Sequence, residues 1–144
     1  MRHKLLHEHH GLRTYVLVFQ TGDEAMAGLL DFAKAMDLRG SRITAIGAFR
    51  EATLAYFNWE TKKYESIPVP EQVEVLSLLG DIALDGDEPA VHVHAVLGRR
   101  DGSTVGGHLK EGIVRPTLEV IIDEQPEHLH KVPDRVSGLA LIRP

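Results

Sequence analysis

The chain has 144 residues, a formal net charge of −5 and no cysteine. Its length fits one domain with its own hydrophobic core, and without cysteine neither a disulfide framework nor a thiolate metal site can form. A hydrophobic share of 43% with 26% charged residues is typical of a globular chain rather than a disordered one. We therefore expect a single domain over residues 1–144.

The charge pattern also limits the partners and the location of the protein. The 16 Lys and Arg residues are scattered among 21 Asp and Glu residues, without the basic stripe that phosphate recognition requires, which argues against DNA binding. No run of about 18 apolar residues occurs, and the first residues lack the apolar core of a signal peptide. We expect a cytoplasmic protein with no membrane partner.

The amino-terminal part is predicted to contain a strand followed by the main helix. Residues 1–10 hold four irregularly spaced histidines, and we interpret them as a loosely ordered polar lead-in. Leu12 to Gln20 carries apolar residues on both faces, which predicts a buried strand. Thr21 and Glu24 match a capping box, and a helix should follow and end near Gly40. Its apolar stripe comprises Ala25, Leu29, Phe32, Ala33 and Met36.

From Ser41 onward the pattern changes to strands. Runs of β-branched and aromatic residues, separated by turn-forming residues, predict a meander. One helix with about eight strands gives the fold class α+β: a predominantly antiparallel, strongly curved β-sheet with one main helix packed on it. The expected strands are Arg42 to Phe49, Glu51 to Trp59, Tyr64 to Val69, Val73 to Leu79, Pro89 to Leu97, Thr117 to Asp123 and Val136 to Ile142.

Histidines in and after the strand Pro89 to Leu97 are the main chemical signal of the sequence. Successive side chains of a strand point to opposite faces, so His92 and His94 share one face and the valines beside them share the other. Arg99 to Ser103 contains Asp-Gly, a strong hairpin signal. The returning chain can then bring His108 close to the pair.

Three imidazoles that converge on one point would form a metal site. Neutral imidazole binds zinc, nickel, copper and iron, and three protein nitrogens with an open position are typical of a catalytic or exchangeable site. Gly106 and Gly107 make a tight bend before His108 possible. The alternative is that His92 and His94 are half-exposed strand residues and that His108 is a turn residue bonded to backbone. The metal interpretation predicts zinc or another divalent transition metal.

Four segments occur in the order seen in one known family: AFREATL at 48–54, VLSLLGDI at 75–82, PAVHVH at 89–94 and GGHL at 106–109. By these segments nearly the whole chain resembles the PPC domain, which plants and prokaryotes share and which lies beside AT-hooks in plant nuclear proteins. The resemblance implies the PPC fold and strengthens the three-histidine site. It also implies a homotrimer, because the stand-alone prokaryotic members form homotrimers.

The DNA binding of the plant members is not implied residue by residue. They bind AT-rich DNA through a separate AT-hook, whose Arg-Gly-Arg-Pro core lies in the minor groove. This chain has no such segment, and Arg115-Pro116 alone does not supply it. Association with DNA therefore rests on the family resemblance alone, and we expect the partners to be other copies of the chain and an unidentified protein or small ligand.

Two functions remain open at this point. The first is a homotrimeric binding or regulatory domain with a structural or ligand-sensing metal. The second is a small metal-dependent hydrolase or lyase that uses a metal-bound water. The enzyme would need a general acid or base, for which Glu51, Glu111 and Glu119 are the candidates, and Arg50 could hold an anionic ligand.

A trimer would also explain why apolar residues occupy both faces of several strands. One face of the curved sheet would pack on the helix and the other on a neighbouring subunit. The alternative is that the same residues form ordinary intrachain core. The candidates for subunit contacts are Val73, Val75, Leu118, Val120 and Ile122.

Overall fold

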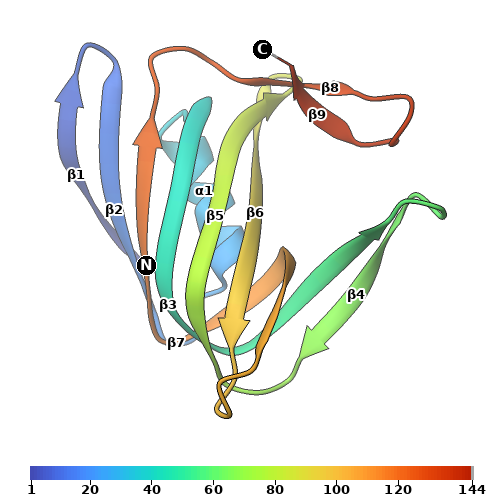
Figure 1. Ribbon diagram of the computed structural model, residues 1–144. Helices are drawn as coiled ribbons and strands as arrows, with labels where there is room; N and C mark the ends of the chain where they lie inside the picture. Colours follow the sequence, from blue (N-terminus) through green and yellow to red (C-terminus); the bar gives the residue numbers. More distant parts are fainter. Residues whose placement is uncertain (144) are drawn as a thin grey trace.

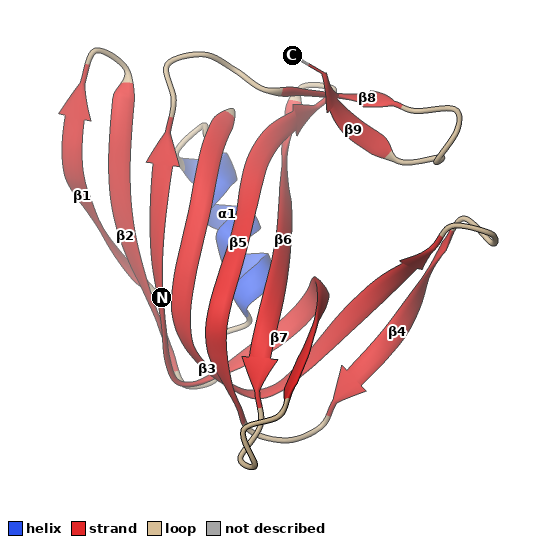
Figure 2. Cartoon of the chain, viewed as in Figure 1, coloured by secondary structure: helices blue, strands red, loops and turns tan. Residues whose placement is uncertain are grey.

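One helix and nine strands make up residues 1–143, the part of the chain that the computed structural model describes (Figures 1 and 2). In chain order they are β1 (Arg2–His9), β2 (Leu12–Gln20), α1 (Ala25–Ala35), β3 (Gly40–Asn58), β4 (Lys63–Val69), β5 (Val73–Asp85), β6 (Glu88–Gly98), β7 (Thr104–Glu124), β8 (His130–Pro133) and β9 (Ala140–Arg143). No helix within these residues is long and apolar enough to cross a membrane.

The strands form one strongly curved sheet, as the sequence predicts. Its main order is β1-β2-β7-β3-β5-β8-β9, with β4 paired to β3 and β6 paired to both β5 and β7. All pairs are antiparallel except the short pair of β5 with β8. Because β6 bridges β5 and the start of β7, hydrogen-bonded pairing runs in a closed circuit through β3, β5, β6 and β7 (Figure 2). The fold class α+β is confirmed.

The helix covers the concave side of the sheet, where it contacts β6 and β7 (Figure 1). Leu29 and Ala33 of α1 are completely buried, as are Leu17 and Phe19 of β2. These side chains belong to one continuous hydrophobic core that includes residues from both ends of β7. The outward side of β3, β5 and β6 is left to polar residues, the histidines and several exposed apolar side chains.

The core also contains all the residues considered for subunit contacts. Their exposed fractions are at most 2% within a single chain, so they leave no surface for a neighbour. The intrachain alternative is correct for this set, because alternate residues of these strands face the helix and the inside of the curved sheet. The five residues are Val73, Val75, Leu118, Val120 and Ile122.

The predicted helix is present, but its ends differ from the prediction. Glu24, not Thr21, is the N-cap, and its carboxylate accepts hydrogen bonds from the backbone N–H groups of Met26 and Ala27. Thr21 instead donates to the carbonyl of Pro116 on β7. The helix ends at the C-cap Met36, and Gly40 is already the first residue of β3. Glycine there admits a close approach of the backbone of Glu127.

Two strands are longer than the sequence predicts. The segments predicted as Arg42 to Phe49 and Glu51 to Trp59 merge into the single strand β3, which ends at Asn58, and Gly106, Gly107 and the segment Thr117 to Asp123 all lie in β7. The two glycines therefore form no bend before His108. Their role is close packing, since a side-chain carbon on Gly107 would lie 2.8 Å from the carbonyl oxygen of Ala55.

The two ends of the described chain also differ from the prediction. Residues 2–9 form β1, which pairs with β2 from Arg2 opposite Val18 to His9 opposite Leu12, with one register shift between Leu5 and His7, so they are not a loose lead-in. All eight residues of β1 are exposed, which explains why no apolar alternation marked the strand. Near the other end, the predicted strand from Val136 is shortened to β9, because Ser137 folds back onto the carboxylate of Asp134.

Candidate metal centre

Three histidines lie together on the outward face of β6 and β7. Val93 and Ala95 of β6 are buried in the core, and the alternation of the strand turns His92 and His94 to the opposite, outward face. His94 is directly opposite His108 in the antiparallel pair of β6 with β7. The three side chains offer ligand atoms that all lie within 4.8 Å of one another.

The hairpin between β6 and β7 sets this register. The backbone N–H of Arg99 donates to the carbonyl of Ser103 at 2.8 Å, and Gly102 adopts a left-handed conformation with φ of 84°. Asp101 accepts from the backbone N–H of Ser103 and so rigidifies the turn. The Asp-Gly hairpin signal thus correctly predicts that the chain returns and brings His108 to the pair.

The spacing of the histidine nitrogens fits a tetrahedral ion. Nε2 of His92 and Nε2 of His94 are 3.2 Å apart. Two nitrogens bound to one zinc ion at about 2.0–2.1 Å with tetrahedral geometry would be about 3.3 Å apart. Two imidazole lone pairs at this separation repel each other unless a proton or a cation lies between them. The donor set therefore fits zinc or a similar divalent metal.

Asp81 supports His92 from the neighbouring strand. The two residues are opposite each other in the pair of β5 with β6, and Nδ1 of His92 is 3.5 Å from Oδ2 of Asp81. A carboxylate on the far nitrogen of a metal-ligating histidine fixes the tautomer and the orientation of the ring. Lys131 of β8 lies 3.6 Å from the other carboxylate oxygen. Burial favours a higher pKa for Asp81, but His92 and Lys131 together hold its pKa below the usual value.

His108 is the most enclosed of the three histidines. The ring of Tyr64, from β4, lies 4.9 Å from its ring, and its Nδ1 is buried without a hydrogen-bond partner. Burial, with the positive charge of Lys110 as the next cause, lowers the pKa of His108 to about 4. Burial and the nearby His92 also lower the pKa of His94. Both rings are therefore neutral at pH 7, which is the state that binds a metal.

The sequence candidates Glu51, Glu111 and Arg50 are not part of the histidine cluster. Glu51 and Glu111 line a separate cavity of about 250 Å³ between β3, β4 and β7. Arg50 is paired with Glu51 at 2.6 Å on an exposed surface. Within residues 1–143, the group of potential metal ligands contains the three histidines and no carboxylate.

Glu119 is also remote from the histidines. It is opposite Ile46 in the pair of β7 with β3, whereas His94 lies on β6, beyond both β3 and β5. Three strand spacings correspond to about 14 Å along the sheet. Glu119 borders a groove of about 290 Å³ together with apolar side chains of β3 and β5.

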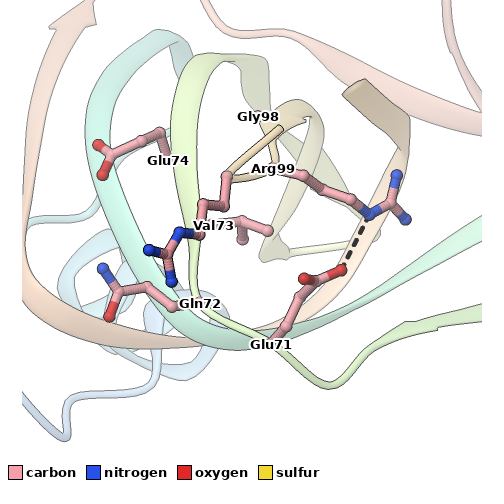
Figure 3. A pocket seen from close by; sticks show the side chains of 7 residues that line it. Glu71, Gln72, Val73, Glu74, Gly98 and Arg99 are labelled. Carbon is pink, nitrogen blue, oxygen red and sulfur yellow. Dashed lines mark hydrogen bonds and ion pairs between the residues drawn. The ribbon is translucent and has the colours of Figure 1, made fainter. Parts of the chain in front are cut away.

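A larger cavity, of about 490 Å³, lies elsewhere on the molecule. It is formed where the segment before β5 meets the turn after β6, and Figure 3 shows the ion pair of Arg99 with Glu71, 2.9 Å apart, on one side of it. None of the three histidines lines this cavity. Size alone would therefore have pointed to a different part of the protein.

The fold and the site define a class of protein: a one-helix domain on a closed antiparallel sheet, with a histidine cluster on the outward face. The chain belongs to the Plants and Prokaryotes Conserved (PCC) domain family, whose model matches residues 6–126. This match confirms the family that the sequence motifs indicate.

Solved structures share this fold over nearly the whole chain. A plant- and prokaryote-conserved (PPC) protein from Pyrococcus horikoshii is 32% identical with a TM-score of 0.85, and the match covers 99% of this chain and 95% of that one. A metal-containing protein from Archaeoglobus fulgidus is 30% identical with a TM-score of 0.84, over 91% and 93%. A protein from Bacteroides thetaiotaomicron, provisionally named as DNA-binding, is 26% identical with a TM-score of 0.89, over 98% and 96%.

The curated relatives are much longer proteins. The bifunctional proteins GlmU of two Synechococcus strains are 31% and 29% identical to this chain over 130 residues, which is 88% of the chain. The chain spans only about a fifth of their length, 20% and 19%. The match therefore concerns a domain of those proteins.

Sequence reasoning missed Asp81, Tyr64 and Lys131, which surround the histidines. The only signal for Asp81 was its place in a segment typical of the family, where its Gly-Asp pattern resembled a loop. Its contact with His92 depends on the register of β5 with β6, which the sequence alone does not reveal. Tyr64 and Lys131 come from β4 and β8, far from the histidines along the chain.

Proposed function

We propose that this chain is a homotrimeric binding or regulatory domain that holds a divalent transition metal, zinc foremost, on His92, His94 and His108. The observation that carries the proposal is the convergence of three imidazoles, with two Nε2 atoms 3.2 Å apart. Asp81 in contact with His92 and the unpartnered Nδ1 of His108 support it. A metal held there would supply a Lewis-acidic centre with an open position.

The comparisons support a metal but do not identify it. The Archaeoglobus fulgidus protein that shares the fold is described as metal-containing, and its 30% identity extends over most of both chains. Three nitrogen ligands suit zinc, nickel, copper or iron. We favour zinc because three histidine ligands with an open fourth position are typical of zinc sites in proteins.

We prefer a binding domain to a hydrolase or lyase because the site lacks a free proton acceptor. The three glutamates considered for this role lie outside the cluster. Asp81 is the carboxylate in contact with a cluster histidine, and it is engaged by both His92 and Lys131. Its lowered pKa suits a residue that positions His92 better than one that exchanges protons.

Metal analysis of purified, untagged protein tests the site. We expect about one metal ion per chain in the wild type, as for a single cluster, and its loss in both His92→Ala and His108→Ala. His9→Ala is the matched control, because His9 is an exposed histidine on β1. Absence of metal in the wild type after incubation with zinc would refute the proposal, and so would retention of metal in both cluster variants.

The homotrimer is supported by an apolar surface on the outward face of the sheet. Ile46, Leu76, Leu79 and Val96 are between 43% and 61% exposed, and the first three line the same shallow groove. We call these four residues the outer apolar patch. An exposed patch of this kind is typical of a protein interface, and we propose that a second copy of the chain covers it.

DNA is not part of the proposal. The chain carries more acidic than basic residues, and the DNA-related name belongs to the Bacteroides protein at 26% identity. We propose that the ligand of the domain is another protein or a small molecule that reaches the open position of the metal.

A further inference from the structure

Two lysines from different strands border the histidine cluster. Lys131 of β8 has a side chain that is only 9% exposed, and its Nζ lies 3.6 Å from Asp81. Lys110 of β7 extends over the ring of Tyr64, with Nζ 4.3 Å from the ring centre. Since Tyr64 in turn packs against His108, both ammonium groups lie close to the site.

Aromatic side chains form one boundary of the site. The ring of Tyr64 lies 4.9 Å from that of His108 and 5.3 Å from that of Phe57. Tyr64 and Phe57 are directly opposite each other in the pair of β3 with β4. In Figure 1 this pair of strands and the β8–β9 hairpin both project away from β1. The histidine cluster therefore has Tyr64 as a neighbour from the β3–β4 pair and Lys131 as a neighbour from the β8–β9 hairpin.

The local charge is opposite to that of the whole chain. The contacts around the cluster include two lysines, Lys110 over Tyr64 and Lys131 beside Asp81, and one carboxylate, that of Asp81, although the chain as a whole carries −5. Lys110 approaches His108 through the ring of Tyr64, and Lys131 approaches His92 through Asp81. A divalent metal bound there would add to this positive charge.

We propose that the open position of the metal centre takes a small oxyanion, a carboxylate or a phosphate, with Lys110 and Lys131 as counter-charges and the Tyr64 ring as one wall. This inference rests on the proposed metal site. The net positive surroundings favour an anion over a neutral or cationic ligand. Within residues 1–143 no protein carboxylate joins the ligand cluster, so an oxygen from outside the chain can enter.

Cobalt-substituted protein provides the test, because the visible absorption of cobalt(II) responds to a change in its ligands. Acetate, benzoate and inorganic phosphate are titrated separately into the loaded wild type, Lys110→Met and Lys62→Met. We expect a saturable spectral change in the wild type and about tenfold weaker anion binding in Lys110→Met, the loss of one charge-assisted contact. Lys62→Met should match the wild type, since Lys62 packs on Trp59 in the turn between β3 and β4.

The three anions distinguish the possible ligands. Tighter binding of benzoate than of acetate would support the Tyr64 ring as a wall of the site and a ligand that joins a carboxylate to a flat apolar group. Tighter binding of phosphate than of either carboxylate would indicate a phosphorylated ligand. Lys131→Met is avoided because it would also release Asp81 from its contact.

The possible failures are separable. If cobalt does not bind the wild type at all, the metal site itself is wrong and the anion site is wrong with it. If cobalt binds but no anion changes its spectrum, the metal site stands and this inference is overturned. Equal anion affinities for Lys110→Met and Lys62→Met would overturn the role of Lys110.

Discussion

Asp81 lies where a metal-ligating histidine commonly finds its supporting carboxylate. Its carboxylate contacts Nδ1 of His92, while Nε2 of the same ring faces Nε2 of His94. We expect Asp81→Asn to bind zinc 10- to 100-fold more weakly, as is typical when such a partner is changed. A competition titration with a chromophoric chelator measures the difference. Asp87→Asn, in the exposed turn between β5 and β6, should keep the affinity of the wild type, and equal affinities for both variants would remove Asp81 from the site.

The enclosed ring of His108 predicts an unusual titration in the metal-free protein. Because burial and nearby positive charges disfavour its protonated form, its pKa should be about 4, well below the ordinary value of about 6.5. The folded state then binds fewer protons than the unfolded state. The stability that this histidine contributes is complete above about pH 6.5 and is lost as the pH falls through about 4.

Histidine resonances recorded by NMR between pH 3.5 and 8 check this prediction. A midpoint for His108 near 6.5 would show that water reaches the ring freely.

At this scale the convergence of the three histidines could be predicted, and their surroundings could not. His92 and His94 follow from alternation, which is a local rule, and His108 follows from the hairpin signal. Asp81 and Tyr64 depend on which residues face each other across strands, and that register arises from packing of the whole sheet. The glutamates lie outside the cluster for the same reason: Glu119 is outward-facing like the histidines, but it lies on the far side of two strands.

The start of α1 shows how one residue can join a helix to the sheet. The carboxylate of Glu24 accepts from the backbone N–H groups of Met26 and Ala27, and also from that of Gly112 on β7. Glu24→Ala would leave these donors without a partner, and we expect it to lower the free energy of unfolding by about 2 kcal/mol.

Thr21→Ala is the matched variant, because the sequence pattern had favoured Thr21 as the cap. Its hydroxyl makes one exposed contact with Pro116, so the loss should be less than about 0.5 kcal/mol. Urea unfolding of both variants measures the two values. A larger loss for Thr21→Ala would mean that Thr21 caps the helix in solution.

Most elements could be predicted from the sequence, and their lengths could not. Gly40, Gly106 and Gly107 are signals for ends and turns, yet all three lie inside strands. At these positions glycine allows close backbone approach, which the sequence does not distinguish from a turn. The strand β1 was not predicted because all its residues are exposed, so its backbone pairing with β2 requires no apolar pattern in the sequence.

For the whole molecule, the outer apolar patch predicts self-association, and the family resemblance implies that the assembly is a trimer. We expect the wild type to have three times the 16.0 kDa mass of one chain, measured by light scattering after size exclusion. Leu79→Lys should shift the protein to monomer, because it would bury a charge at the interface. Val136→Lys is the control, since Val136 is 67% exposed in the β8–β9 hairpin. A monomeric wild type, or a trimer that tolerates Leu79→Lys, would refute the proposed interface.

The outer apolar patch and the candidate metal centre share a border, because Leu79 is directly opposite His94 in the pair of β5 with β6. If copies of the chain associate through Leu79, association and metal binding are thermodynamically linked. The factor by which metal binding strengthens association must equal the factor by which association strengthens metal binding. Dilution would then release metal as well as subunits, and the abundance of the protein would influence how much of it is loaded.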